Sequence, residues 1–326
     1  MRLPEFEYVE PRSLKEATAM LAAEPEAAML AGGTDLLVSM KHRVIQPKRL
    51  VNLQGLAELK QITNGDDGVT IGSLTTLHAI ASSSLLRKSY PALASAAGEV
   101  GAYALQVMGT LGGNLCQGNR CRYYNQSASW RSARPLCYKA GGEICHIVRK
   151  PGECHSTYCG DVAPVLIALG ADVTAVGPAG MRTFPVAELY THDGKKPLSL
   201  KPGEIIKHVS LPPDPGTTVY LKWRLRQAIE FPIVSVALSL RKGKEGRIEQ
   251  ARVVFSGVGP GPVEATKVEK LMQGASLNEC TVKKVTDLAA KEISPMRTSI
   301  YSAAYKRRMA AVLLEKALEE SERMKP

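Results

Sequence analysis

The sequence has few aromatic residues, no long hydrophobic run and almost no cysteine outside one segment. Only 4 Phe and 2 Trp occur among its 326 residues. No apolar stretch approaches the about 20 residues that a membrane-spanning helix requires, so we expect a soluble protein that makes no contact with a membrane. The N-terminal residues MRLPEFEYVEPRS lack the apolar centre of a secretory signal, which predicts a cytoplasmic location.

The chain is strongly basic, with a formal net charge of +11. Proteins that bind nucleic acids concentrate Lys and Arg in one stripe and use aromatic residues to stack on bases. Neither feature is present here, so we expect no nucleic acid among the partners. The charge instead favours an acidic protein partner or an anionic cofactor, and an ordinary solvated surface is the alternative.

Six of the seven cysteines fall in one polar segment between Thr110 and Asp161. A disulfide framework suits a small secreted domain, whereas this chain has 326 residues and no recognisable secretory signal. Structural zinc sites usually show paired Cys-x2-4-Cys knuckles, whereas these cysteines are separated by 4, 15, 7, 8 and 4 residues. Residues 116–160 hold seven Lys or Arg and two Glu, and this positive charge would stabilise an anionic iron–sulfur cluster. Spacing alone leaves open a cluster, a zinc site or incidental thiols in a basic loop.

Hydrophobic periodicity predicts an α+β fold with two domains. The predicted first domain, residues 1–215, has strands at 27–30, 50–53, 69–74 and 171–176 and helices at 75–86, 91–100 and 162–169. Ser13 and Glu16 form a capping box that opens one further helix. After a Pro- and Gly-rich segment, the predicted domain of residues 216–326 has an antiparallel sheet, with strands at 219–225, 233–240 and 251–256, and helices at 265–272, 282–292 and 299–320.

Two segments with paired glycines are candidate anion sites, and the second of them lies just before the first cysteine of the loop. The first, MLAGGTDLL at 29–37, is a short strand that breaks into glycines before a helical pattern, and the second is GTLGGN at 109–114. Glycines let backbone N–H groups approach phosphate oxygens, and a following helix adds partial positive charge. Side chains of Thr110 and Asn114 could donate further hydrogen bonds. Each segment alone is a weak signal, because paired glycines most often mark tight turns.

Together these segments resemble the flavin-binding subunits of the xanthine oxidase family of molybdenum hydroxylases. The resemblance is carried by AGGTDLL at 31–37, IGSLTTL at 71–77, YPAL at 90–93, GTLGGNLC at 109–116 and GDVAPVLIALGADV at 160–173. It extends to the C-terminal segments YLKWRLRQAIEFPIVSVAL and SIYSAAYKRRMAAVLLEKAL. The cysteine-rich insertion, residues 116–159, is similar to that of one branch of the family, the 4-hydroxybenzoyl-CoA reductases. The resemblance to the family implies a two-part α/β FAD-binding domain and a smaller C-terminal domain of antiparallel sheet and helices.

The resemblance implies two cofactors, FAD and a [4Fe–4S] cluster. The implied cluster ligands are Cys121, Cys137, Cys145 and Cys154, whereas Cys116 corresponds to a non-ligand, Cys159 is an unexpected thiol that could replace Cys154, and Cys280 is expected to be free. The implied residues around the FAD pyrophosphate are Met29, Leu30, Ala31, Gly32, Gly33, Thr34, Asp35, Leu36, Thr110, Leu111, Gly112, Gly113 and Asn114. Asp161 is implied near the ribitol or ribose hydroxyls and Lys222 near the adenosine end. The alternatives are that Asp161 only caps a helix and that Lys222 is a solvated surface residue.

The function that the resemblance implies is electron transfer within a heterohexamer that contains a small [2Fe–2S] subunit and a large molybdopterin subunit. In the main interpretation, low-potential electrons from ferredoxin pass through the cluster and FAD so that the large subunit can reduce 4-hydroxybenzoyl-CoA to benzoyl-CoA. The chain would then be an oxidoreductase subunit that is not catalytic alone. A second interpretation is the FAD subunit of an oxidative molybdenum hydroxylase, which delivers electrons to NAD or another acceptor. A third is a non-enzymatic, zinc-stapled basic binding protein.

Overall fold

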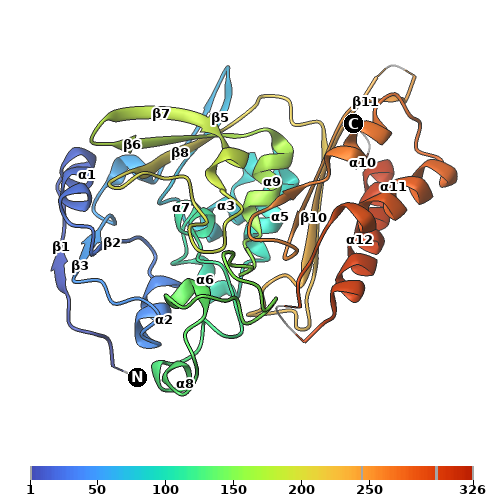
Figure 1. Ribbon diagram of the computed structural model, residues 1–326. Coiled ribbons are helices and arrows are strands. Elements are labelled where there is room, and N and C mark those ends of the chain that lie inside the picture. Colours follow the sequence, from blue (N-terminus) through green and yellow to red (C-terminus); the bar gives the residue numbers. More distant parts are fainter. Residues whose placement is uncertain (1, 244, 298–299, 325–326) are drawn as a thin grey trace.

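The N-terminal part of the chain contains a small parallel sheet. The computed structural model describes residues 2–243, 245–297 and 300–324 (Figure 1). In spatial order the strands of this sheet are β1 (Glu7–Val9), β3 (Arg49–Asn52) and β2 (Ala27–Leu30). Helix α1 (Leu14–Ala23) precedes β2, and the Oγ of its cap Ser13 accepts the N–H of Glu16. The predicted hydrogen bond from the Glu16 N–H to the Ser13 side chain is thus confirmed. The Glu16 carboxylate accepts the N–H of Arg12 and not that of Ser13.

A five-stranded antiparallel sheet follows. Its strands, in spatial order, are β4 (Ile62–Gly65), β5 (Gly68–Gly72), β8 (Ile205–Leu211), β6 (Asp172–Gly177) and β7 (Gly180–Pro185). Helices that share its hydrophobic core include α3 (Leu77–Ser82), α4 (Ser84–Ser89), α5 (Pro91–Gly98) and α9 (Val162–Leu169). The single helix predicted at 75–86 is two helices. Ser83 adopts an extended conformation and caps the second one through its side chain, so the helical backbone is interrupted there.

The third sheet is antiparallel, as predicted, and carries three helices on one face (Figure 1). Its strands, in spatial order, are β12 (Val263–Glu264), β11 (Ile248–Ser256), β10 (Val234–Lys242) and β9 (Thr217–Trp223). The helices are α10 (Thr266–Met272), α11 (Glu279–Glu292) and α12 (Ala303–Arg323). Residue 299, where the last predicted helix begins, lies outside the described residues. These observations and the domain matches below confirm the predicted fold class.

The third sheet contributes to two hydrophobic cores. Along β10, Val236 and Leu238 pack with the C-terminal helices, whereas Ala237 between them packs with α5 and α9. Successive residues of a strand point to opposite faces, so one strand can serve both cores. The predicted division at residues 215 and 216 falls in the loop between β8 and β9, and the core crosses it. This shared packing brings residues of β9 beside the N-terminus of α9.

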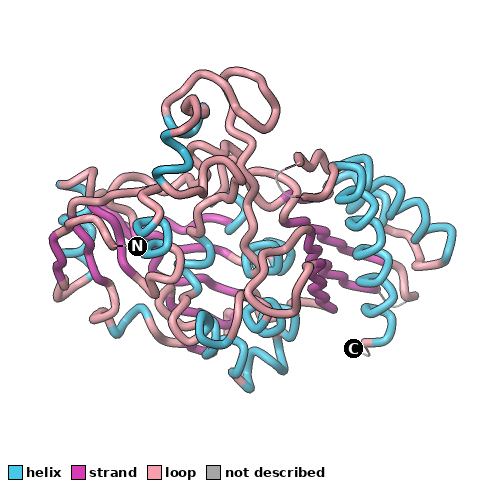
Figure 2. Tube along the Cα trace, turned by 90° about the horizontal axis from the view of Figure 1, so that it is seen from below, coloured by secondary structure: helices cyan, strands magenta, loops and turns pink. Residues whose placement is uncertain are grey.

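The cysteine-rich residues 116–159 form a loop that protrudes from one side of the molecule (Figure 2). Its only helical pieces among the described residues are α8 (Ala128–Ser132) and the 3-10 turn η2 (Tyr138–Ala140). The remaining short elements of the chain are α2 (Leu36–Lys41), η1 (Ala57–Leu59), α6 (Tyr103–Gln106), α7 (Leu111–Leu115) and η3 (Val186–Leu189). No helix within the described ranges is long and apolar enough to cross a membrane.

Candidate flavin and cysteine sites

The first glycine segment, which follows β2, lies directly against the second. A Cβ atom added to Gly32 would stand 1.9 Å from the carbonyl oxygen of Met108, so only glycine permits this approach of two backbones. Thr34 also lies close to the second segment, because its Oγ1 would be 3.6 Å from a Cβ added to Gly109. Gly33 has a φ of +71°, which other residue types adopt at a cost. The fold therefore brings the two predicted flavin segments together.

The backbone of the first glycine segment offers open hydrogen-bond donors. In the part of the chain that the structure describes, the N–H groups of Gly32, Gly33 and Thr34 donate to no protein acceptor. Successive N–H groups of this kind bind phosphate oxygens. The other predicted residues of the segment lie at the end of β2 or the start of α2: Met29, Leu30, Ala31, Asp35 and Leu36. These features fit one half of a pyrophosphate site.

The second glycine segment is a short helix and not the open turn that the sequence indicates. Thr110 caps α7, and its Oγ1 accepts the N–H of Gly113 at 3.1 Å. The N–H of Gly112 donates to the carbonyl oxygen of Ser73 at 2.8 Å, and a Cβ at Gly112 would lie 2.9 Å from the Ser73 Cβ. Both N–H groups are therefore occupied. Gly112 serves close packing here, while Leu111 and Asn114 are buried parts of the same helix.

Asp161 and Lys222 form a buried ion pair. The Nζ of Lys222 lies 3.0 Å from Oδ1 of Asp161, and the side chains are only 1% and 3% exposed. The Lys222 ammonium also donates to the carbonyl oxygen of Glu99 at 2.9 Å. The alternative that Lys222 is a solvated surface residue is therefore wrong. Asp161 holds the cap position of α9 but makes no capping hydrogen bond with its side chain, so the alternative that it is only a helix cap is also wrong.

Tyr220 completes this buried group, and the sequence pattern did not indicate its role. Its hydroxyl donates to Oδ1 of Asp161 at 2.6 Å. Tyr220 and Lys222 are two residues apart in β9 and so share one face of the strand, which is the signal that could have found it. Burial raises the pKa of Asp161 to about 6, and Lys222 and the Tyr220 hydroxyl act in the opposite direction. The charge of Asp161 at neutral pH therefore depends on these two partners.

Replacing Lys222 by methionine should destabilise the protein strongly. The substitution keeps a long apolar side chain but leaves the Asp161 carboxylate buried without its cation, which costs about 3–5 kcal/mol and raises the pKa of Asp161 further. Arg241→Met is the matched control, because its partner Asp214 is 72% exposed and Arg241 itself 46% exposed, and such pairs contribute little. Urea unfolding of both variants measures the difference. Equal free energies of unfolding for the two variants would contradict the importance of the buried pair.

The cysteine loop is attached to the first glycine segment by Asp35. One carboxylate oxygen of Asp35 pairs with the guanidinium of Arg120, and the other accepts the N–H of Gly118 at 3.1 Å. The Arg120 guanidinium also lies over the ring of Phe231, 4.8 Å from its centre. Arg120 thus joins the flavin segment, the start of the cysteine loop and the loop after β9. Nothing in the sequence pattern indicated this role.

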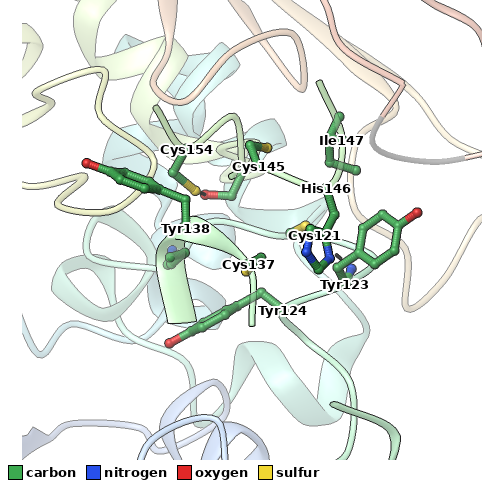
Figure 3. Close-up of a pocket in the computed structure, with 11 residues that line it drawn as sticks. Cys121, Tyr123, Tyr124, Cys137, Tyr138, Cys145, His146, Ile147 and Cys154 are labelled. Carbon is green, nitrogen blue, oxygen red and sulfur yellow. Dashed lines mark hydrogen bonds between the residues drawn. The ribbon is translucent and has the colours of Figure 1, made fainter. Parts of the chain in front are cut away.

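The four cysteines predicted as cluster ligands line one small cavity in the loop. They come from separate stretches of the loop and surround a common space (Figure 3). The other residues that line the cavity are Tyr123, Tyr124, Tyr138, Lys139, His146, Ile147 and Ser156, and the four cysteines are Cys121, Cys137, Cys145 and Cys154. Burial raises the pKa of Cys121 and lowers that of Lys139. Negative charge on Cys154, Cys121 or Cys137, when they are thiolates, acts in the opposite direction and raises the pKa of Lys139.

The other three cysteines lie outside this cavity. Burial raises the pKa of Cys116 to about 12 and that of Cys159 to about 11, so both are neutral thiols at physiological pH. Cys280 is exposed. Since the Cys159 side chain contacts the carbonyl oxygen of Thr157 and Cys154 borders the cavity, the geometry favours Cys154 as the fourth member of the group.

The side chains that line the cavity, as far as the structure describes them, form no recognisable metal-binding group. Within the described ranges, no three His, Cys, Asp or Glu side chains meet closely enough to hold one metal ion. A [4Fe–4S] cluster takes one thiolate on each iron, so its ligands surround it without converging on one point. Lys139 supplies positive charge beside the thiols. The cluster itself stays a prediction.

Comparison with known proteins assigns the family. Residues 4–214 match the model of the FAD binding domain in molybdopterin dehydrogenase, and residues 220–321 match the CO dehydrogenase flavoprotein C-terminal domain. The chain belongs to this flavoprotein family. It is an FAD-binding subunit of the molybdenum hydroxylase type, and FAD is its cofactor. The interpretation as a non-enzymatic binding protein is therefore wrong.

Relatives of this flavoprotein subunit cover nearly the whole chain. The FAD-binding subunit of an aldehyde oxidoreductase from Escherichia coli is 32% identical over 83% of this chain and 87% of its own length. The glyceraldehyde dehydrogenase medium chain of Sulfolobus acidocaldarius is 28% identical over 97% and 98%. The solved structure of a Cu,Mo-CO dehydrogenase aligns with a TM-score of 0.82 at 24% identity, covering 99% of both chains. That last likeness shows the fold.

Proposed function

We propose that this flavoprotein is the electron-transfer subunit of a dehydrogenase-type complex. Its partners would be a small [2Fe–2S] subunit and a large molybdopterin subunit in a heterohexamer, and NAD or another acceptor would receive the electrons. The observation that carries the proposal is the match of both flavoprotein domains along the chain. The names of the relatives, a glyceraldehyde dehydrogenase medium chain and an aldehyde oxidoreductase subunit, favour oxidation of the substrate.

Within this proposal, the described residues hold and orient FAD. The open N–H groups at Gly32, Gly33 and Thr34 would bind one phosphate, and α7 would close the site from the other side. Asp161 and Lys222 are almost fully buried in the group that they form with Tyr220, so they would support the hydroxyl and adenosine end of the site from within the protein. FAD, when bound, supplies one- and two-electron chemistry. The molybdopterin would be held by the large subunit, so the isolated subunit should not convert a substrate.

A second candidate function rests on the cysteine cavity. Four cysteines around one cavity and the adjacent Lys139 support a [4Fe–4S] cluster, an addition that would suit a 4-hydroxybenzoyl-CoA reductase. Such a complex would take electrons from ferredoxin and remove the phenolic hydroxyl, which leaves as water, to give benzoyl-CoA. The net charge of +11 would favour docking of an acidic ferredoxin. The direction of electron flow is then opposite to that of the first candidate.

Cofactor content and electron donor separate the two candidates. The isolated chain, purified without oxygen, should contain one FAD and no iron in the first case, and one FAD with about four iron atoms in the second. Reduced ferredoxin should then bleach the flavin only in the second case, and the rate should fall with salt because screening limits electrostatic reach to about 8 Å at physiological ionic strength. A chain purified without FAD, and unable to take it up, would contradict both candidates.

A further inference from the structure

Two tyrosines are buried between the end of the cysteine loop and helix α7. Tyr158 is 1% exposed and Tyr190 is 5% exposed, and their ring centres are 4.9 Å apart in an edge-on arrangement. The two hydroxyl oxygens lie 3.1 Å from each other. Neither residue belongs to the flavin segments, the ion pair or the cysteine cavity, so no function described above accounts for this pair.

The hydrogen bonds of the pair run in one direction. Tyr190 donates its hydroxyl to the carbonyl oxygen of Leu115 at 3.0 Å. A phenol carries a single hydrogen, so Tyr158 must be the donor toward Tyr190. The carbonyl oxygen of Asn114 lies 3.4 Å from the Tyr158 hydroxyl and shares that donor. The order is therefore Tyr158 to Tyr190 to the last carbonyl of α7.

The carbonyls that receive these hydrogen bonds end the helix formed by the second glycine segment. The last carbonyls of a helix have no partner within it, and Leu115 is fully buried, so water cannot replace Tyr190. The Asn114 side chain meanwhile accepts the N–H of Val162 at 3.3 Å, one residue after Asp161. The end of α7 is thus fixed between the tyrosine pair and the start of α9.

The backbone of Tyr158 is itself held in place. Its N–H donates to the carbonyl oxygen of Gly259 at 2.9 Å, and its own carbonyl accepts the N–H of Gly257 at 3.1 Å. The preceding residue, Thr157, exchanges two backbone hydrogen bonds with Arg120 at the start of the loop. The hydroxyl of Tyr158 therefore extends from a rigid frame at the root of the cysteine loop.

From this arrangement we infer that Tyr158 and Tyr190 are positioning residues of the flavin site. They hold the C-terminal end of α7, and with it the segment from Thr110 to Asn114, at the distance from Gly32 and Thr34 that FAD requires. The inference rests on the placement of the FAD pyrophosphate between the two glycine segments. It also makes the root of the cysteine loop part of the support of the flavin.

The test compares three tyrosine-to-phenylalanine variants of the full chain. Tyr90→Phe is the matched control, because Tyr90 is 2% exposed, lies in the same hydrophobic core and donates to the carbonyl oxygen of Pro212 at 2.6 Å. Tyr90→Phe loses one phenol hydrogen bond to a carbonyl, and Tyr158→Phe loses the hydrogen bond that it donates to Tyr190. Tyr190→Phe loses both the bond accepted from Tyr158 and the bond donated to Leu115. Only Tyr158→Phe and Tyr190→Phe should change the flavin site. FAD affinity by titration, the flavin midpoint potential and the unfolding temperature are measured for each.

We expect FAD affinity to fall about tenfold or more in Tyr190→Phe, less in Tyr158→Phe, and not at all in Tyr90→Phe. The double variant Tyr158→Phe/Tyr190→Phe should lose little beyond Tyr190→Phe, since the two hydroxyls act as one unit. If the pair is merely structural, all three variants lower the unfolding temperature alike and keep the affinity and potential of the wild type, which overturns the inference. Gly32→Ala distinguishes failure of the positioning role from failure of the proposed FAD placement. If Gly32→Ala loses FAD while the tyrosine variants bind it normally, only the positioning role is refuted. If Gly32→Ala retains FAD, the placement of the pyrophosphate is refuted.

Discussion

Gly32→Ala is expected to remove FAD from the purified protein. The new Cβ would stand 1.9 Å from the carbonyl oxygen and 2.7 Å from the carbonyl carbon of Met108. Both are backbone atoms, so no side-chain rotation can relieve the collision and the two flavin segments must separate. We expect affinity for FAD to fall at least about 100-fold, equivalent to about 2.7 kcal/mol. The flavin absorbance of the protein and titration with free FAD measure the effect.

Gly55→Ala is the matched control for this variant. Gly55 lies in the same part of the chain, and a Cβ there would meet no atom within 4 Å. It should therefore keep one FAD per chain and the unfolding temperature of the wild type. Stoichiometric FAD in Gly32→Ala would show that the close approach of the two segments is not needed for the cofactor.

The second large effect concerns iron. If the cavity holds the proposed cluster, replacing Cys121, Cys137, Cys145 or Cys154 by serine should remove about four iron atoms per chain, because a hydroxyl is a poor substitute for a soft thiolate on iron. FAD should remain in these variants and stay reducible by dithionite, since the glycine segments lie outside the loop. An iron assay and the electron paramagnetic resonance spectrum of the reduced protein give the result.

The remaining cysteines supply the controls. Serine at Cys159 changes a buried thiol outside the cavity, serine at Cys116 changes a partly buried one, and serine at Cys280 changes an exposed one. All three variants should keep the iron content of the wild type. If Cys159→Ser loses iron and Cys154→Ser does not, Cys159 is the fourth ligand and the assignment at the end of the loop must be changed. Wild-type protein purified anaerobically without iron would remove the basis for the reductase candidate.

Loss of FAD and loss of iron are expected to be separable, although the flavin region and the cysteine loop contact each other. The cysteine loop meets the flavin region through Asp35 and Arg120 at one root and through Tyr158 at the other. These contacts involve residues 118, 120, 157 and 158, none of which lines the cavity. A serine variant that disorders the middle of the loop can therefore leave the roots intact, whereas the tyrosine variants weaken the flavin site without touching a cysteine.

The sequence by itself determined the local structure and the family. The cap at Ser13, the strand at 27–30, the helix at 162–169 and the antiparallel C-terminal sheet follow from patterns over a few neighbouring residues, and the structure has them. The glycine segments and the C-terminal motifs identified the flavoprotein family, which the domain matches confirm. The division of the helix at 75–86 was missed, because one serine in an extended conformation decides it.

Only the tertiary structure decided which side chains meet. Lys222 and Asp161 are 61 residues apart, and their pairing depends on the packing of β9 beside α9. The glycines at 112 and 113 look like an open turn in the sequence, yet they belong to a short helix in which Ser73 accepts the N–H of Gly112 and Thr110 accepts that of Gly113. The irregular spacing of the cysteines gave no geometry, and folding of the loop selected four of them for one cavity. Such contacts form when segments far apart in the sequence pack together and become buried, and local residue patterns do not encode that packing.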